Sequence, residues 1–166
     1  MSIVAIITGD IIHSSRLQTA ERIQLMERLE QIFEDLEAQS LLDGREIFRG
    51  DSFQLMLSNA DEALKAALLI KTGLKKNIYE VKEGKQQADA RISIGIGEVS
   101  YQGERLGTSD GEAYRLSGRA LDKMKKRNSL TINSIWREVN EEMDVACALS
   151  EAIIGRWTQA QSAIIY

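Results

Sequence analysis

The spacing of apolar residues predicts strands in the first third of the chain. Residues 2–9 are apolar at nearly every position, which is typical of a central strand covered by other elements. Residues 47–55 hold two short apolar runs on either side of Arg49-Gly50-Asp51-Ser52. This pattern predicts a β-hairpin with its turn at Gly50-Asp51, where a glycine can adopt positive φ and allow a close approach of another group.

Apolar residues at three- and four-residue steps predict the helices. We expect helices over residues 19–39, after Asn59 and over residues 111–127, and a largely helical stretch over residues 134–166. Residues 80–89 are polar and predict a loop. The expected buried positions of the first two helices are Ile23, Leu25, Met26, Leu29, Ile32, Phe33 and Leu36, then Ala63, Ala67, Ile70, Leu74 and Ile78.

A further strand over residues 90–99 has two different faces. Three isoleucines, Ile92, Ile94 and Ile96, alternate with the small residues Ser93, Gly95 and Gly97. A face of small residues allows either a helix or a ligand to pack closely, and we expect a helix. A short strand over residues 129–132 follows the third helix.

The order of these elements predicts an α+β fold. Strand-helix-strand occurs twice, joined at the hairpin, which is a ferredoxin-like βαββαβ core extended by a further helix and strand. We expect one mainly antiparallel sheet with its helices on one face. The predicted domain covers residues 1–133, and residues 134–166 form a C-terminal helical extension.

Composition narrows the classes of protein and site. A chain of 166 residues, 43% of them hydrophobic, suffices for one domain with its own core. A net charge of -4 argues against binding nucleic acid through a general basic surface. One cysteine and one histidine exclude an internal disulfide and Cys/His metal clusters, so a metal would need oxygen ligands. No apolar run is long enough for a bilayer and no basic segment precedes the first strand, so we expect a cytoplasmic protein without a membrane partner.

Two acids stand at the ends of predicted strands. Asp10 ends the first apolar run and Asp51 lies in the hairpin turn, so neighbouring strands would bring both to one sheet edge. Two carboxylates at one edge suit Mg²⁺. The alternative is that each aspartate only stabilises its own turn.

Basic and hydroxyl side chains offer candidate phosphate contacts. Ser14, Ser15 and Arg16 follow Asp10, and they either hold phosphate oxygens or cap the coming helix. In the third helix, Ala113, Leu116, Ala120 and Met124 form the expected buried side. A cationic stripe formed by Arg115, Arg119, Lys123 and Lys126 faces either phosphates or solvent. Gly118 inside this helix points to close packing or close approach.

These motifs together resemble a known family. Asp10-Ile11, residues 49–53, residues 91–99 and residues 111–119 resemble the class III nucleotidyl cyclase catalytic domain. The chain as a whole is similar to the bacterial SatD family, a divergent relative of those cyclases.

The resemblance implies roles for several residues. Asp10 and Asp51 match the two metal-binding aspartates, and Arg119 matches the catalytic arginine that stabilises the transition state. With them we count a set of candidate nucleotide-binding residues, namely Ile11, Ser14, Ser15, Arg16, Gly50, Arg115, Arg119 and Lys123. The resemblance also implies a homodimer, because cyclase sites usually form between two subunits.

Two positions depart from the cyclase pattern. Arg115 stands where cyclases carry a catalytic asparagine, and Ile47 stands where they carry a base-selecting lysine. Both argue against cyclisation of ATP or GTP and leave binding of a nucleotide with Mg²⁺ open.

Three functions follow from these features. The leading one is a SatD-like regulatory protein whose domain binds a nucleotide with Mg²⁺ and controls a DNA-binding module. The alternatives are a dimerisation scaffold without ligand, and a divergent nucleotidyl cyclase or nucleotidyltransferase. SatD-like proteins commonly continue into a helix-turn-helix, and residues 150–161 resemble the approach to it, so DNA would be a partner only through residues beyond these.

Overall fold

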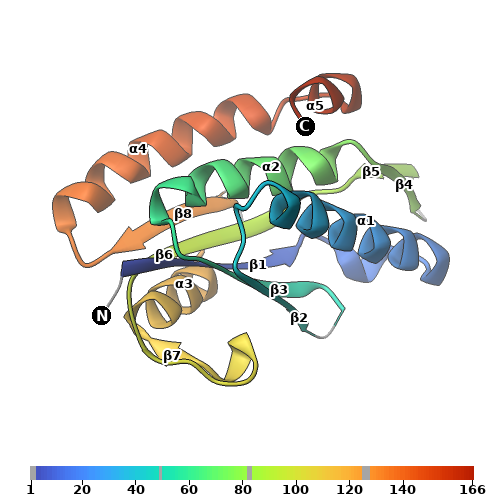
Figure 1. Ribbon diagram of the computed structural model, residues 1–166. Coiled ribbons are helices and arrows are strands. Elements are labelled where there is room, and N and C mark those ends of the chain that lie inside the picture. Colours follow the sequence, from blue (N-terminus) through green and yellow to red (C-terminus); the bar gives the residue numbers. More distant parts are fainter. Residues whose placement is uncertain (1–2, 49, 82–83, 125–127) are drawn as a thin grey trace.

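A computed structural model describes residues 3–48, 50–81, 84–124 and 128–166 of the chain. It shows a mixed sheet with helices on both faces (Figure 1). The strands of the main sheet are β1 (Ile3–Ile11), β2 (Gly44–Phe48), β3 (Ser52–Leu57), β6 (Ala90–Tyr101), β7 (Asp110–Gly111) and β8 (Leu130–Ser134). The helices are α1 (Thr19–Ala38), α2 (Ala63–Lys75), α3 (Glu112–Lys123), α4 (Arg137–Ile154) and α5 (Gln159–Ile165).

Strand β1 is at the centre of the sheet. It pairs antiparallel with β3 on one side and with β6 on the other, and β2 pairs with β3 at the edge. The resulting order β2-β3-β1-β6 is that of the predicted ferredoxin-like core. The predicted further helix and strand are α3 and β8, and β8 runs parallel to β6. The predicted fold class is therefore confirmed.

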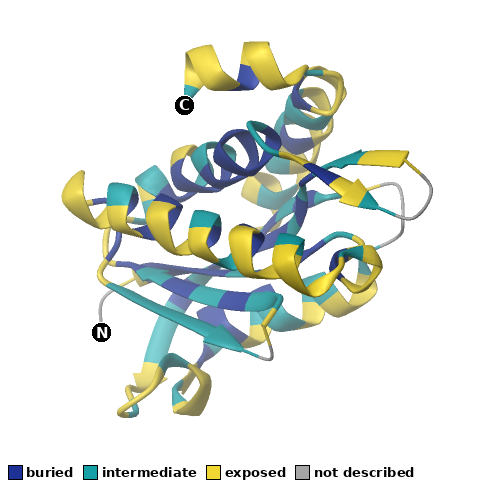
Figure 2. Cartoon of the chain, turned by 90° about the vertical axis from the view of Figure 1, so that its right-hand side faces the viewer, coloured by how far each residue is buried: buried dark blue, intermediate teal, exposed yellow. Residues whose placement is uncertain are grey.

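The main core lies between the sheet and the helices α1 and α2. Inward-facing residues of β1, among them Ala5 and Ile7, meet the buried faces of both helices. The rings of Phe33 on α1 and Phe53 on β3 pack edge to face, with their centroids 5.4 Å apart. Figure 2 shows that burial is concentrated on the strands and the inner faces of the helices, while their outer faces are exposed.

Helix α3 covers the opposite face of the sheet, so the expectation of helices on one face is wrong (Figure 1). The cause is the small-residue face of β6. A side chain at Gly95 would lie 2.6 Å from the backbone nitrogen of Ser117 and closer still to the carbonyl oxygen of Ala113. Only glycine lets α3 approach this strand, and the prediction that a helix packs on the small residues is confirmed.

The buried side of α3 also differs from the expected one. Ala113, Tyr114 and Ser117 are buried, whereas Leu116, Ala120 and Met124 are only partly covered. Gly118 has no neighbouring atom of the described residues within 4 Å of a Cβ built on it, so close packing is not the reason for this glycine.

Three further expectations about local structure are wrong. The polar stretch after α2 forms a separate two-stranded sheet, β4 (Ile78–Val81) with β5 (Gly84–Gln87). Tyr79 is its only buried residue in the described part of the two strands, so these strands lack the apolar alternation that reveals a strand. Ile78 therefore belongs to β4 and not to the buried stripe of α2. On α1, Ile23 is exposed and not part of the core.

The C-terminal residues are helical, as predicted. Helix α4 packs on β8 through Met143 and Cys147, and α5 packs on α2 (Figure 1). Tyr166 follows α5 and donates a hydrogen bond of 2.5 Å to Asp35 on α1. A boundary between domain and extension at residue 133 stays a prediction. Across the described ranges, no helix is both long and apolar enough to cross a membrane.

Candidate functional site

A pocket of about 600 Å³ opens where the C-terminal end of β1 meets the first residues of β3 and β6. The pairing register explains this gathering: Asp10 on β1 lies opposite Ser52 on β3 and opposite Arg91 on β6. The pocket is lined by Asp10, Ile11, Ile12, His13, Asp51, Ser52, Arg91, Asn128 and Ser129.

Arg91 binds the carboxylate of Asp10 with two hydrogen bonds. Nε lies 2.9 Å from Oδ1 and Nη2 lies 2.5 Å from Oδ2. This two-point contact raises the pKa of the Arg91 guanidinium above its usual value, because the hydrogen bonds to Asp10 favour the charged form. In this conformation, Arg91 fixes the orientation of Asp10.

The side chain of Asp51 is held by hydroxyl groups. Ser14 donates a hydrogen bond of 2.7 Å to Oδ2, and Ser52 donates a longer one of 3.3 Å to Oδ1. The carbonyl oxygen of Asp51 accepts from the backbone nitrogen of Ile11 at 2.8 Å, which ties the hairpin turn to the end of β1. Asp51 therefore does more than stabilise its own turn.

The serines after Asp10 have different surroundings. Ser14 is buried and donates to Asp51, whereas Ser15 and Arg16 are exposed on the 3-10 turn η1 (Ser14–Arg16). Helix α1 starts after Gln18 without a side-chain cap, so neither serine caps it.

The remaining predicted site residues lie elsewhere. Gly50 is exposed in the hairpin turn with φ of +80°, which agrees with a turn role. Arg115, Arg119 and Lys123 are exposed on α3, and none of them lines the pocket. Arg115 instead binds Asp110, with its Nη1 2.7 Å from Oδ1. Arg49 of the hairpin motif and Lys126 of the cationic stripe are outside the described residues.

Lys71 does not line the pocket but donates hydrogen bonds to residues beside it. This lysine on α2 is 1% exposed, and its Nζ donates to Asp89 Oδ1 at 2.8 Å, to the Ala90 carbonyl at 2.8 Å and to Ser129 Oγ at 2.9 Å. Lys75 approaches the second oxygen of Asp89 at 3.2 Å. Lys71 thereby joins the first residues of β6, next to Arg91, to the segment before β8 that lines the pocket.

Sequence reasoning missed Arg91 and Lys71 as parts of the site. Arg91 had a signal, because it falls on the small-residue face of its strand and so points away from the isoleucine core. Its pairing with Asp10 depends on the register between two strands 81 residues apart, which periodicity does not give. Lys71 also had a signal, since it interrupts an apolar run at a position four residues after Ala67.

The residue types of the site fit a hard divalent cation. Asp10 and Asp51 supply carboxylate oxygens, as Mg²⁺ prefers, and Mg²⁺ commonly keeps waters or phosphate oxygens as its other ligands. Among the described residues, no group of three or more His, Cys, Asp or Glu side chains gathers. A cation here would thus have two carboxylates and would compete with Arg91 for Asp10.

Comparison with solved structures places the fold among nucleotidyl cyclase domains. The monomeric guanylyl cyclase domain of the RhoGC fusion protein from the fungus Blastocladiella emersonii matches with a TM-score of 0.59 and 17% identity, over 87% of this chain and 86% of that one. The guanylate cyclase domain of RhGC from Catenaria anguillulae, solved with GTP, gives 0.54 and 18%, over 75% and 74%.

Diguanylate cyclases show the same likeness. The active GGEEF domain of a diguanylate cyclase from Vibrio cholerae gives a TM-score of 0.55 and 14% identity, over 82% of this chain and 85% of that one. No family model matches the chain, and no curated protein does. The molecule has the fold of a nucleotidyl cyclase catalytic domain and is divergent in sequence. Membership of the SatD family stays a prediction.

Proposed function

We propose that this domain binds a nucleotide, and that its polyphosphate and Mg²⁺ occupy the pocket at the end of β1. The observation that carries the proposal is the convergence of Asp10, Asp51 and Arg91 on one pocket of about 600 Å³, with the buried Ser14 hydrogen-bonded to Asp51. Such a volume is within the usual range for small-molecule sites, roughly 300–1,000 Å³. Two of the similar structures described above are guanylyl cyclase domains, and one of these was solved with GTP.

The side chains of the pocket divide into two kinds. Asp10 and Asp51 would hold Mg²⁺, and a bound cation would supply the charge that neutralises phosphate oxygens. Arg91 would meet those oxygens as well, since a guanidinium binds phosphate at two points just as it binds carboxylate. Ser14 keeps Asp51 oriented toward the strand end through the hydrogen bond of 2.7 Å.

Binding is a better proposal for this site than cyclisation. Arg115 stands at the position of the cyclase asparagine, and its guanidinium is engaged by Asp110 at 2.7 Å. Ile47 stands at the position of the base-selecting lysine and packs against the main core, where it offers no polar contact to a base. Arg119 is exposed on α3 and does not line the pocket of its own chain, so a catalytic role for it would require a second subunit.

A regulatory role is the finer part of the proposal. It rests on the sequence resemblance to SatD proteins. The proposals of a homodimer and of control over a DNA-binding module rest on the same resemblance. The acidic balance of the chain, with a net charge of -4, agrees with a sensing domain more than with one that contacts DNA.

Isothermal titration tests the nucleotide site. ATP and GTP are titrated with and without Mg²⁺ into the wild type and into Asp51→Asn, which keeps the shape and the acceptor for Ser14 but removes the charge. We expect Mg²⁺-dependent binding to the wild type and at least about a tenfold loss of affinity in the variant, because one anionic ligand of the cation is gone.

A matched control separates the site from general charge effects. Asp61→Asn changes an exposed aspartate that does not line the pocket, and its affinity should equal that of the wild type. If the folded wild type binds neither nucleotide, the proposal is wrong. If Asp51→Asn binds as well as the wild type, a nucleotide binds elsewhere on the domain.

A further inference from the structure

Helix α4 has a second apolar face in addition to the one that packs on the sheet. Its inward side carries Cys147, which belongs to the main core, Met143, which packs against that core, and the buried Ile154. At 100° per residue, the opposite side of the helix is occupied by Val145, Leu149 and Ile153. These three side chains are 61%, 61% and 59% exposed, and no described residue covers them.

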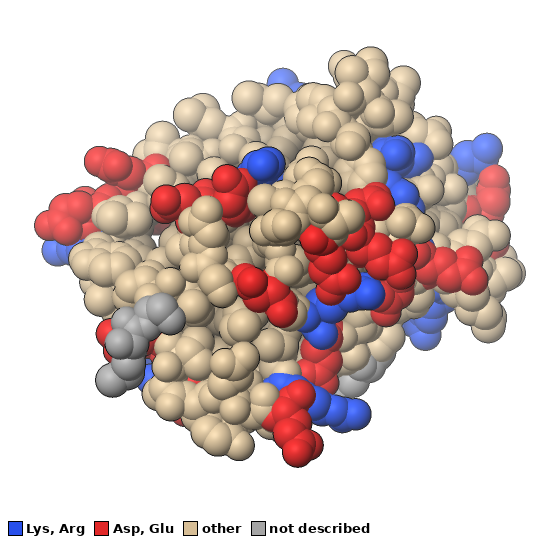
Figure 3. Space-filling model, viewed as in Figure 1, with Lys and Arg blue, Asp and Glu red and all other residues tan. Residues whose placement is uncertain are grey.

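The outward face changes character along its length. Glu142 lies on it at one end, the apolar residues occupy the middle, and Arg156 lies at the other end, just after the helix. Exposed alanines, Ala148 and Ala152, flank Leu149 and would let another helix approach closely. Figure 3 shows acidic side chains grouped toward the left end of the molecule, where α4 begins, and mostly uncharged surface along the upper edge.

This order of charges is self-complementary under a two-fold axis. If two copies of α4 pack antiparallel with Leu149 against Leu149, positions equally far before and after residue 149 face each other. Val145, four residues before, then meets the partner's Ile153, four residues after. Glu142, seven residues before, meets the partner's Arg156, seven residues after. Steps of four and seven residues keep Glu142, Val145, Leu149 and Ile153 on one side of α4, and Arg156 follows in the turn that ends the helix.

We propose that the outward face of α4 is the contact surface for a second copy of this chain, in antiparallel two-fold packing centred on Leu149. The apolar middle is buried between the two helices, and each Glu142 pairs with the partner's Arg156. Neither residue makes an ion pair within the described part of its own chain, so both are available across the contact. In a closed two-fold dimer the same patch serves on both subunits, as the charge order requires.

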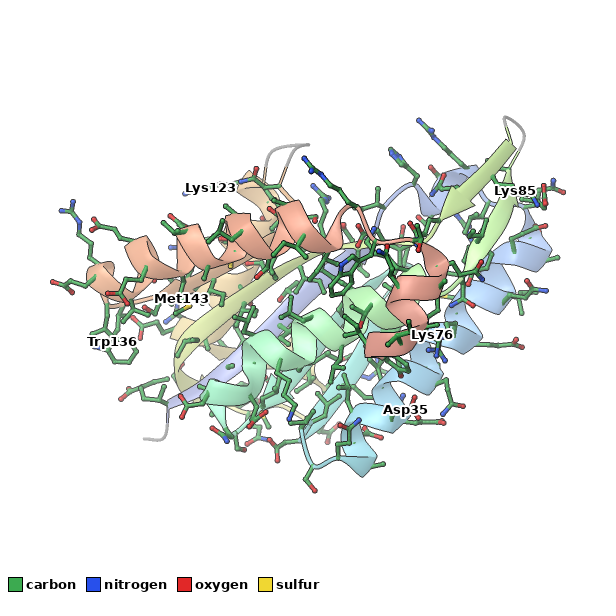
Figure 4. The ribbon with its side chains drawn as sticks, turned by 90° about the horizontal axis from the view of Figure 1, so that it is seen from above. Asp35, Lys76, Lys85, Lys123, Trp136 and Met143 are labelled. Atoms are coloured by element: carbon green, nitrogen blue, oxygen red, sulfur yellow. The ribbon has the colours of Figure 1, made fainter. Side chains whose placement is uncertain are left out.

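The surface is independent of the nucleotide site. None of its residues lines the pocket. Figure 4, which looks down on the molecule, shows α4 and α5 as the uppermost elements, with Trp136 at the start of α4. Met143 packs against the main core. Failure of nucleotide binding would therefore leave this proposal untouched.

One helix pair is a small interface. Stable complexes bury roughly 1,200–2,000 Å², more than a single pair of helices supplies, so we expect a weak dimer that forms only at high protein concentration. Sedimentation equilibrium over a wide range of protein concentration detects such a dimer as a mass that rises from 18.6 kDa toward twice that value.

Charge reversal tests the pairing directly. Glu142→Arg and Arg156→Glu each place like charges opposite one another at two symmetric contacts, and each should raise the dimer Kd about tenfold. The double variant Glu142→Arg/Arg156→Glu exchanges the two charges and should return the Kd to within about threefold of the wild type. Leu149→Asp should weaken the dimer at least about thirtyfold, because a carboxylate would lie at its centre.

A matched control and clear opposite outcomes complete the test. Ile23→Asp changes a side chain with 55% exposure on α1 and should leave the dimer unchanged, and far-UV circular dichroism should show native helix content in every variant. A wild type that stays monomeric up to millimolar concentration overturns the proposal. The proposal is also overturned if Leu149→Asp leaves the dimer Kd unchanged, or if the double variant dimerises as weakly as the single variants.

Discussion

Replacing Lys71 with methionine should remove more stability than any surface change on α2. Lys71 is 1% exposed, and its ammonium donates three hydrogen bonds of 2.8–2.9 Å, to Asp89, to the Ala90 carbonyl and to Ser129. Methionine has a similar length, so the change leaves the packing volume nearly intact and removes mainly the charge and its donors.

The magnitude follows from the groups left behind. Breaking a buried ion pair by removing one partner costs roughly 3–5 kcal/mol when the remaining charge is unpaired. Here Lys75 stays 3.2 Å from the other oxygen of Asp89, which lowers that cost. The Ala90 carbonyl loses a donor in a buried setting, at roughly 1–3 kcal/mol. Together these values predict a loss of about 3 kcal/mol in the free energy of unfolding.

Urea unfolding followed by far-UV circular dichroism measures this loss. Lys65→Met is the matched control, because Lys65 lies on the same helix, is 58% exposed and forms only a surface pair with Glu62 at 3.1 Å. Its unfolding free energy should stay within about 0.5 kcal/mol of the wild type. A loss below about 1 kcal/mol in Lys71→Met would refute the reasoning and show that apolar packing replaces the buried network, as happens in some proteins.

Two further predictions concern packing and the single thiol. Gly95→Ala should destabilise the protein by about 2–3 kcal/mol in urea unfolding, since its methyl group would meet backbone atoms of α3. Gly118→Ala should stabilise it by roughly 0.5–1 kcal/mol, because open space surrounds this position and alanine favours a helix. Equal effects of the two substitutions would contradict the placement of α3. Burial is the main cause, and the nearby Glu151 and Asp144 the lesser one, that raises the pKa of the Cys147 thiol from 9.0 to about 11. At pH 8, Ellman's reagent should therefore modify the native protein at least about 100-fold more slowly than the urea-unfolded chain. Comparable rates would show that this thiol is accessible in the native protein. The same shift predicts the sign of a pH effect: the thiol stays protonated longer in the folded state, so its contribution to stability is complete below pH 9 and is lost as the pH rises from about 9 to 11.

The elements of the fold were predictable because their patterns are local. The alternation around Gly50-Asp51 and the three- and four-residue steps of α1 and α2 each depend on neighbouring residues. Local sequence patterns do not reveal on which side of the sheet α3 packs. Val4 and Ile6 on β1 face α3 while Ala5 and Ile7 face the main core, so a strand apolar at every position was consistent with either arrangement.

The site was predictable only in part for the same physical reason. Asp10 and Asp51 follow from strand ends, which the sequence marks clearly, and the pairing of β1 with β3 brings them to one edge. The contact between Asp10 and Arg91 depends on the register of β1 against β6, and a slip of one residue would have turned Arg91 to the other face. The cationic stripe of α3 follows a clear helical period, yet periodicity does not say where the helix docks, and the described part of this stripe lies outside the pocket.

The ion pair between Arg91 and Asp10 has a consequence for the proposed binding. Both carboxylate oxygens of Asp10 accept from the guanidinium, so a cation that approaches alone must displace a charged partner at 2.5–2.9 Å. A phosphate group offers Arg91 an equivalent two-point acceptor, and Asp10 is then released for the cation. If the proposed binding is right, phosphate and Mg²⁺ would favour each other's binding, and linkage requires the effect to be the same in both directions. The Mg²⁺ dependence of nucleotide affinity is therefore the most informative property to measure.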